Sequence, residues 1–90
     1  MAGYRLLIKT SAAKEIRAIG TKRDRGSVVG RILALAAEPR PPGCEKPTGS
    51  SGLYPVREGQ YRVFYAIDDA GRTIDVIKVG HRREVYRGAS

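Results

Sequence analysis

Residues 53–80 read LYPVREGQYRVFYAIDDAGRTIDVIKVG, a stretch with three runs of strand-forming residues. The runs are residues 53–57, 61–67 and 72–80. The segments between them, Glu-Gly-Gln and Asp-Asp-Ala-Gly, are rich in residues that favour turns. Because connections this short join antiparallel neighbours, the stretch predicts an antiparallel meander of three strands.

The chain before this meander begins with a strand and a helix. Residues 4–9 form a short apolar run that predicts a strand. Good helix formers fill residues 12–19, with Thr10 or Ser11 available as the N-cap and Gly20 as the stop. The pattern predicts a short amphipathic helix directly after the first strand.

The inward faces of the helical segments are apolar. In the first helix, Ile16 and Ile19 are expected to face the core. A polar and basic segment, residues 21–26, follows, and residues 27–38 then repeat apolar side chains at helical spacing until Pro39 ends the helix. These apolar positions are Val28, Val29, Ile32, Leu33, Leu35 and Ala36. The second segment therefore predicts the main core helix.

Residues 39–52 connect this helix to the meander. They are rich in proline and glycine, which predicts an irregular loop. Too little chain lies on either side for two independent cores, so residues 1–90 are expected to form a single domain. The predicted class is α+β, with two N-terminal helices packed on a small, mainly antiparallel sheet in the order β-α-α-β-β-β.

The charge of the chain points to a polyanionic partner. Seventeen lysines and arginines against nine acidic residues give a formal net charge of +8. Most of the cations are arginine, whose planar guanidinium suits phosphate oxygens. Excess charge also keeps small proteins soluble, so charge alone does not decide between these interpretations. The gathering of cations towards the C-terminus favours a phosphate-handling site.

Several other classes of protein are disfavoured. Cys44 is the only cysteine, so it has no internal disulfide partner and no second thiol for a metal set. No run of apolar residues approaches the roughly 20 that span a bilayer, and no secretion signal is evident. We expect a cytoplasmic protein that needs no metal and no cofactor.

The order of elements and three motifs resemble the RelE/ParE superfamily of bacterial toxins. The motifs are Tyr-Arg-Val-Phe-Tyr at 61–65, Val-Gly-His-Arg-Arg at 79–83 and Val-Tyr-Arg at 85–87. The chain looks most similar to the RelE branch. This resemblance implies a toxin of a type II toxin-antitoxin system that enters the ribosomal A site, cleaves mRNA there without a metal, inhibits translation and is neutralised by a cognate antitoxin.

RNA cleavage without a metal uses the 2′-OH as nucleophile on the adjacent phosphorus. It needs a proton acceptor at that hydroxyl, cations around the dianionic transition state and a proton donor at the leaving 5′-oxygen. Arg62 lies in the middle of a predicted strand, and the resemblance assigns it to the scissile phosphate. The structural alternative is an exposed arginine paired with Glu58 or an aspartate.

The segment after the last strand supplies further candidates. His81 is the only histidine, and its ordinary pKa of about 6.5 suits proton transfer near neutrality, although a lone histidine is more often structural. Arg82 matches the family arginine on the leaving-group side, and Arg83 is expected at a neighbouring phosphate. The alternative is a basic strand end that only attracts RNA.

Tyr86 matches a C-terminal family tyrosine that stacks on a base or orients the 2′-OH. Stacking is the safer assignment, and packing of the tail on the sheet is the alternative. Further cations are expected to bind RNA without taking part in the reaction. These are Arg83, Arg87, Lys78 and Lys46.

Arg57 completes the candidate catalytic set, but its position depends on the register of two strands. RelE toxins carry cations at two alternate positions here, and this chain has Pro55 at one of them. Proton abstraction would then fall to His81 or Glu58. A three-residue turn would put Arg57 and Arg62 on opposite faces, whereas a four-residue connection would pair them.

Three functions therefore remain. The first is an mRNA endoribonuclease, the second is a gyrase inhibitor like the ParE toxins, and the third is an RNA- or ribosome-binding module without chemistry. The expected partners are a cognate antitoxin with an acidic or amphipathic helix, mRNA and the ribosome near the A site. Any contact with operator DNA is expected to go through the antitoxin.

Overall fold

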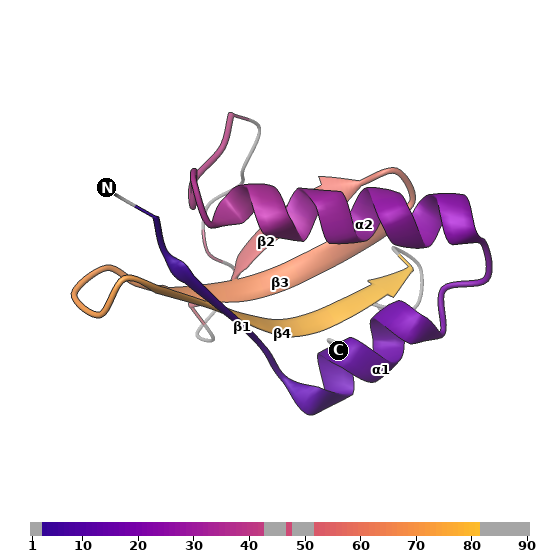
Figure 1. The fold of residues 1–90 in the computed structure, drawn as a ribbon, viewed down its shortest axis with the longest axis horizontal. Coiled ribbons are helices and arrows are strands. Elements are labelled where there is room, and N and C mark those ends of the chain that lie inside the picture. Colours follow the sequence, from indigo (N-terminus) through magenta and orange to yellow (C-terminus); the bar gives the residue numbers. More distant parts are fainter. Residues whose placement is uncertain (1–2, 43–46, 48–51, 82–90) are drawn as a thin grey trace.

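The computed structural model describes residues 3–42, 47 and 52–81, which form two helices and four strands (Figure 1). Along the chain these are β1 (Arg5–Ile8), α1 (Thr10–Arg17), α2 (Lys22–Leu35), β2 (Tyr54–Glu58), β3 (Tyr61–Asp68) and β4 (Thr73–His81). In Figure 1, α2 runs across the sheet, and α1 lies near the C-terminal end of β4. This arrangement confirms the predicted α+β class and the order of elements.

The four strands form one mixed sheet in the order β1-β4-β3-β2. Strands β2, β3 and β4 are antiparallel neighbours, which confirms the predicted meander. Strand β1 lies on the outer side of β4 and runs parallel to it, from Arg5 opposite Thr73 to Ile8 opposite Val76. A parallel pair needs a long crossover, and the helices and the rest of the meander supply it here.

The helices and one face of the sheet enclose the hydrophobic core. Along β3, buried Val63 and Tyr65 alternate with less buried side chains, as expected for a strand with one covered face. Ile16 and Ile19 are buried, as predicted. The remaining buried apolar residues are Ala12, Val28, Ile32, Leu35, Val56, Ile74, Val76 and Val79.

The predicted cap of the first helix is wrong. Helix α1 begins at Thr10, so Lys9 occupies the N-cap position, and no side chain caps the helix. The backbone N–H of Lys9 donates to the carbonyl of Val76 at 2.9 Å. Because this bond extends the pairing of β1 with β4 as far as Lys9, the helix starts directly at the end of the strand.

The predicted bounds of the second helix are also wrong. Helix α2 begins at Lys22, because the Thr21 side chain accepts a hydrogen bond from the backbone N–H of Asp24 at 3.1 Å and caps the helix. The polar, basic segment is thus mostly the first, exposed part of α2. Val29 and Leu33 are exposed, so the buried stripe is narrower than predicted. Neither helix in the described part of the chain is long and apolar enough to cross a bilayer.

A polar cluster ties the segment after α2 to the turn between β3 and β4. The Arg40 guanidinium donates to both carboxylate oxygens of Asp69, at 3.2 and 3.0 Å. The Tyr4 hydroxyl donates to the same carboxylate at 2.8 Å. Arg40 first, and Tyr4 second, hold the pKa of Asp69 below its ordinary value. The cluster is exposed, so it positions these segments more than it stabilises the fold.

The edge position of β2 explains how the sheet tolerates Pro55. Proline has no backbone N–H and is found in sheets at edge strands, where one side of the strand needs no ladder partner. Strand β2 is the last strand of the sheet, and Pro55 lies opposite Phe64 of β3 with its side chain buried. The residue that departs from the family pattern is therefore compatible with the strand.

Tyr65 forms a buried link between the sheet and the end of α2. Its ring is fully buried and stacks on Tyr54 with centroids 5.8 Å apart. Its hydroxyl donates to the carbonyl of Pro39 at 2.7 Å. We expect Tyr65→Phe to lower the free energy of unfolding by about 1–3 kcal/mol, because it removes the donor from that carbonyl.

Urea denaturation measures this effect, with Tyr4→Phe as the matched control. The Tyr4 hydroxyl bond is exposed, so its loss should change stability by less than about 0.5 kcal/mol. Equal effects of the two substitutions would contradict the role given to the buried hydroxyl.

Candidate functional site

The turn between β2 and β3 determines which side chains face each other. Gly59 has φ +61, a conformation that glycine adopts without strain, and Gly59 and Gln60 together form a two-residue turn. This turn pairs Glu58 with Tyr61 and Arg57 with Arg62. The four-residue connection between Arg57 and Arg62 is thus the one adopted, and the two arginines lie directly opposite each other.

Both arginines are on the face of the sheet that α1 and α2 leave uncovered. Val56 and Val63 are buried in the core beneath the helices. Since side chains alternate along a strand, the residues that follow Val56 and precede Val63 point the other way. Arg57 is exposed and Arg62 is half-buried. Gly80 of β4 pairs with Arg62 and completes a row across three strands.

Two guanidinium groups opposite each other create a local excess of positive charge. Like charges at directly opposite positions of an antiparallel pair destabilise the sheet, because their Cβ atoms are only about 5 Å apart. An anion that contacts both groups relieves this repulsion. Arginine is always protonated and can donate two parallel hydrogen bonds to a phosphate. The pair of Arg57 and Arg62 is therefore suited to bind a phosphodiester and to stabilise added negative charge on it.

Glu58 belongs to the other face. It pairs with Tyr61, and its Oε1 lies 3.7 Å from the Nε of Arg31 on α2. The carboxylate therefore faces the helices and pairs with Arg31, so the alternative in which Glu58 pairs with Arg62 is not the arrangement adopted. This placement also separates Glu58 from the phosphate position defined by Arg57 and Arg62.

His81 also lies on the side of the sheet that the helices cover. It is the cross-strand partner of Tyr61, and the two rings meet edge to face with centroids 5.6 Å apart. One ring nitrogen is hydrogen-bonded to the Gln60 side chain at 3.0 Å. The structure therefore puts His81 and Arg62 on opposite sides of the sheet, although both were predicted to serve one reaction.

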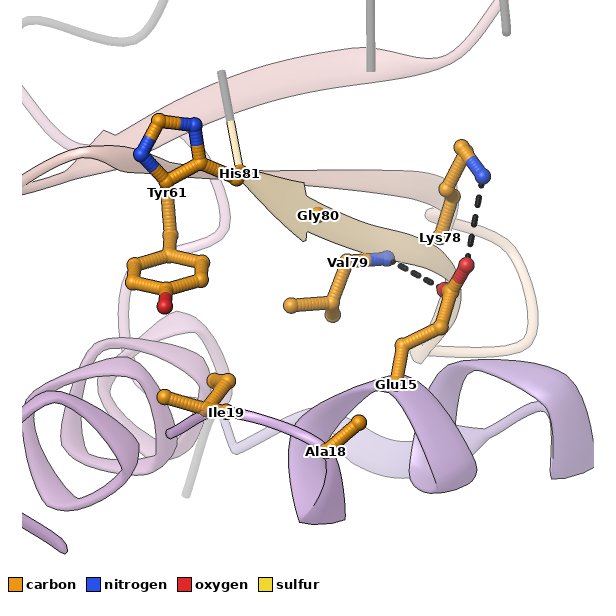
Figure 2. Close-up of a pocket in the computed structure, with 8 residues that line it drawn as sticks. All are labelled: Glu15, Ala18, Ile19, Tyr61, Lys78, Val79, Gly80 and His81. Atoms are coloured by element: carbon orange, nitrogen blue, oxygen red, sulfur yellow. Dashed lines mark hydrogen bonds and ion pairs between the residues drawn. The ribbon is translucent and has the colours of Figure 1, made fainter. Parts of the chain in front are cut away.

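A pocket of about 330 Å³ lies next to His81 (Figure 2). Its walls come from α1, the residues after α1, the start of β3 and the end of β4. They consist of Glu15, Ala18, Ile19, Tyr61, Lys78, Val79, Gly80 and His81. Figure 2 shows the Tyr61 ring pointing from the sheet towards the helical side of this pocket.

Lys78, a predicted RNA-binding residue, forms an ion pair at the edge of this pocket. Its Nζ lies 3.2 Å from a carboxylate oxygen of Glu15. Glu15 and Gln60 were not among the predicted site residues, and no local pattern could have found them, because their partners are many residues away in the chain. The predicted residues Lys46, Arg82, Arg83, Tyr86 and Arg87 lie outside the described residues.

One face of the sheet is covered by helices and the other carries two paired arginines, which agrees with the architecture that the sequence resemblance predicted. The chain belongs to the RelE/ParE superfamily of toxins of type II toxin-antitoxin systems. Its residues 6–86 match the family model described as the ParE toxin of type II toxin-antitoxin system, parDE. This match confirms the resemblance seen in the sequence.

Two toxins of Mycobacterium tuberculosis (strain ATCC 25618 / H37Rv) are similar to this chain in sequence. Toxin RelG is 33% identical, over 73% of this chain and 86% of the relative. Toxin RelE is 30% identical, over 93% of this chain and 87% of the relative. Named relatives thus come from the RelE branch, although the family model carries the ParE description.

Solved structures of RelE proteins share the fold. The toxin-antitoxin complex RelBE2 from Mycobacterium tuberculosis matches with a TM-score of 0.78 and 29% identity, over 91% of this chain and 94% of that chain. The isolated E. coli RelE toxin matches with a TM-score of 0.73 and 29% identity, over 96% and 94%. The two helices on a four-stranded mixed sheet are therefore the fold of RelE proteins.

The register at the arginine pair depends on the conformation of Gly59. Nothing lies within 4 Å of a Cβ placed there, so a larger residue would not clash with its neighbours. It would be destabilised only by the positive φ of the backbone at this position. We expect Gly59→Val to lower the free energy of unfolding by about 1–2 kcal/mol, the cost of a left-handed conformation for a residue with a Cβ. Asparagine tolerates this conformation, so Gly59→Asn should lower the free energy of unfolding by clearly less. Urea denaturation of both variants tests the turn, and equal losses would contradict it.

Proposed function

We propose that this toxin is a ribosome-dependent endoribonuclease that cleaves mRNA in the ribosomal A site and so inhibits translation. The observation that carries the proposal is the cross-strand pair of Arg57 and Arg62 on the sheet face opposite the helices. The named relatives, which are RelE and RelG toxins, support the RelE branch over the ParE branch. The site of action is the cytoplasm, where ribosomes translate.

In the proposed reaction, the ribose 2′-oxygen attacks the neighbouring phosphorus and loses its proton to water, because Glu58 and His81, the bases expected from the sequence, lie on the helix side of the sheet. The bond from phosphorus to the 5′-oxygen then breaks, and the leaving oxygen takes up a proton from water. Between these steps the phosphoryl oxygens carry an additional negative charge. Arg62 and Arg57 stabilise that charge, because their guanidinium groups are held on two hydrogen-bonded strands and need little rearrangement.

Residues after β4 complete the proposed site. Arg82 acts at the leaving oxygen, and Tyr86 stacks on a base of the substrate. The neighbouring phosphates are bound by Arg83, Arg87 and Lys46. We assign Lys78 and His81 to the support of the strand end, because Lys78 pairs with Glu15 and His81 contacts Tyr61 and Gln60. The reaction needs no metal in this proposal, since arginines supply the positive charge.

The proposed protein partner is a cognate antitoxin. Similar structures include complexes of RelE with RelB from Mycobacterium tuberculosis and Pyrococcus horikoshii OT3. A chain with a formal charge of +8 favours an acidic partner segment. Contact with operator DNA, where it occurs, goes through the antitoxin.

A second candidate function is inhibition of DNA gyrase by binding, because the matching family model describes a ParE toxin. The two candidates differ in what the cations do. The nuclease requires the arginine pair at a scissile phosphate, whereas an inhibitor requires only a complementary protein surface.

Primer extension on an mRNA translated in a purified system tests the proposed cleavage. We expect wild-type protein to produce cuts in phase with codons, and only when ribosomes are present. Arg62→Ala should slow cleavage by about 10²–10³-fold, the effect of removing one preorganised charge-stabilising donor. Arg57→Ala and Arg82→Ala should also slow it. Arg23→Ala is the matched control, because it removes the same charge from the exposed start of α2.

Each other outcome overturns the nuclease proposal. An intact message with blocked translation would indicate a ribosome- or RNA-binding inhibitor. An intact message with unaffected translation would favour the gyrase inhibitor, which a supercoiling assay then examines. Equal losses in Arg62→Ala and Arg23→Ala would show that total charge matters and the arginine pair does not.

The placement of His81 leads to a separate expectation. Removal of a general acid or base usually slows a reaction by about 10²-fold or more. Because His81 and Arg62 lie on opposite sides of the sheet, we expect His81→Gln to slow cleavage by much less than about 10²-fold. Glutamine retains a polar group that can bond to Gln60. A loss as large as that of Arg62→Ala in the same assay would instead support proton transfer by His81.

A further inference from the structure

The last part of β4 has no strand on its outer side in the described part of the chain. Strand β1 pairs with β4 only from Thr73 to Val76, and the bond from Lys9 to Val76 ends this ladder. Strand β4 continues to His81. Helix α1 lies along this open edge, as Figure 2 shows.

Glu15 of α1 takes the place of the missing strand. One carboxylate oxygen accepts a hydrogen bond from the backbone N–H of Val79 at 2.8 Å. The other accepts one from the Lys78 ammonium at 3.2 Å. The carboxylate thus binds one backbone group and one side chain of adjacent residues (Figure 2). Charge-assisted hydrogen bonds of this kind are stronger than neutral ones.

The position of Glu15 is itself firmly defined. Its neighbours on the inner side of α1, Ala12 and Ile16, are both buried in the core. Beyond the buried Val79 side chain, a pocket of about 330 Å³ lies between the end of β4 and α1. Glu15 therefore connects a fixed helix to the end of the strand beside this pocket.

This strand end adjoins the proposed catalytic face. Gly80 follows Val79 directly and is the cross-strand partner of Arg62. Any shift of β4 at Val79 therefore changes the position of Gly80 relative to Arg62. A displacement of about 1 Å in an active site can slow a reaction by as much as 10²-fold.

We propose that Glu15 is a positioning residue for cleavage: its carboxylate holds the end of β4 in register with Arg62. The inference rests on the proposed nuclease function. Glu15 does not touch RNA in this scheme, since it lies on the helix side of the sheet.

Three substitutions separate this role from a general loss of charge or stability. Glu15→Gln keeps an oxygen that can accept from the Val79 N–H, whereas Glu15→Ala removes both bonds. Glu38→Ala, at an exposed position after α2, removes the same charge without touching β4. Cleavage is measured on programmed ribosomes well below the unfolding temperature of each variant, so that only folded protein contributes.

We expect Glu15→Ala to lower kcat by about tenfold or more with KM little changed, because positioning acts in the transition state and not on ribosome binding. Glu15→Gln should restore most of the rate, and Glu38→Ala should match wild type. Wild-type cleavage by Glu15→Ala would overturn the inference. So would a Glu15→Gln variant as slow as Glu15→Ala, or a change confined to KM.

Amide hydrogen exchange tests the same inference without any cleavage. In Glu15→Ala, the Val79 amide should exchange about tenfold faster or more, while Val63 in the middle of β3 stays protected. Unchanged exchange at Val79 would overturn the positioning role even if wild type cuts mRNA. If the wild type cuts no mRNA and the Val79 amide still exchanges faster in Glu15→Ala, the nuclease proposal has failed, whereas the positional role of Glu15 at the end of β4 has not.

Discussion

The two-residue turn at Gly59 and Gln60 determines that Arg57 and Arg62 point to the same face of the sheet. A strand has a side-chain period of two, so a shift of one residue would move Arg57 to the face covered by the helices and bring Glu58 out beside Arg62. The positive φ of Gly59 allows the short turn, and the turn aligns Arg57 with Arg62. The buried valines at 56 and 63 favour the same register, because a shift of one residue would turn one of them away from the core.

With this register, the two faces of the sheet have separate tasks. The helix side contains the core and, near the end of β4, the contacts of Glu15, Tyr61 and His81. The other side carries the arginine pair, whose mutual repulsion is a cost that the core must offset. A small domain accepts such a cost where an anion is to be bound, and Arg57 and Arg62 lie where a phosphodiester can relieve it. The polar contacts of Arg40 and Tyr65 hold the far end of the sheet, away from these cations.

Much of this fold could be predicted from the sequence, because its strands are marked by local features. Alternating apolar residues and turn-forming pairs defined the meander, and helical spacing defined both helices. The bounds of α2 were missed because Thr21 caps it through Asp24, and the residues between look polar and irregular.

For His81, its neighbours Arg82 and Arg83 suggested one shared site. The sequence could not reveal its side of the sheet, which depends on pairing with Tyr61 across two strands and on the irregular register between Phe64 and Tyr65. The bond from Glu15 to Val79 joins residues 64 positions apart and has no local signature.

The most direct test of the account is a structure of the toxin on a ribosome whose A-site codon lacks the attacking 2′-OH, determined by electron cryomicroscopy. The account predicts that the uncovered sheet face meets the mRNA, with Arg57 and Arg62 both at the phosphate that would be cut. It also predicts that Glu15 and His81 lie on the side of the sheet away from that phosphate. A complex in which the RNA contacts α1 and α2, or in which the two arginines face solvent, would contradict it.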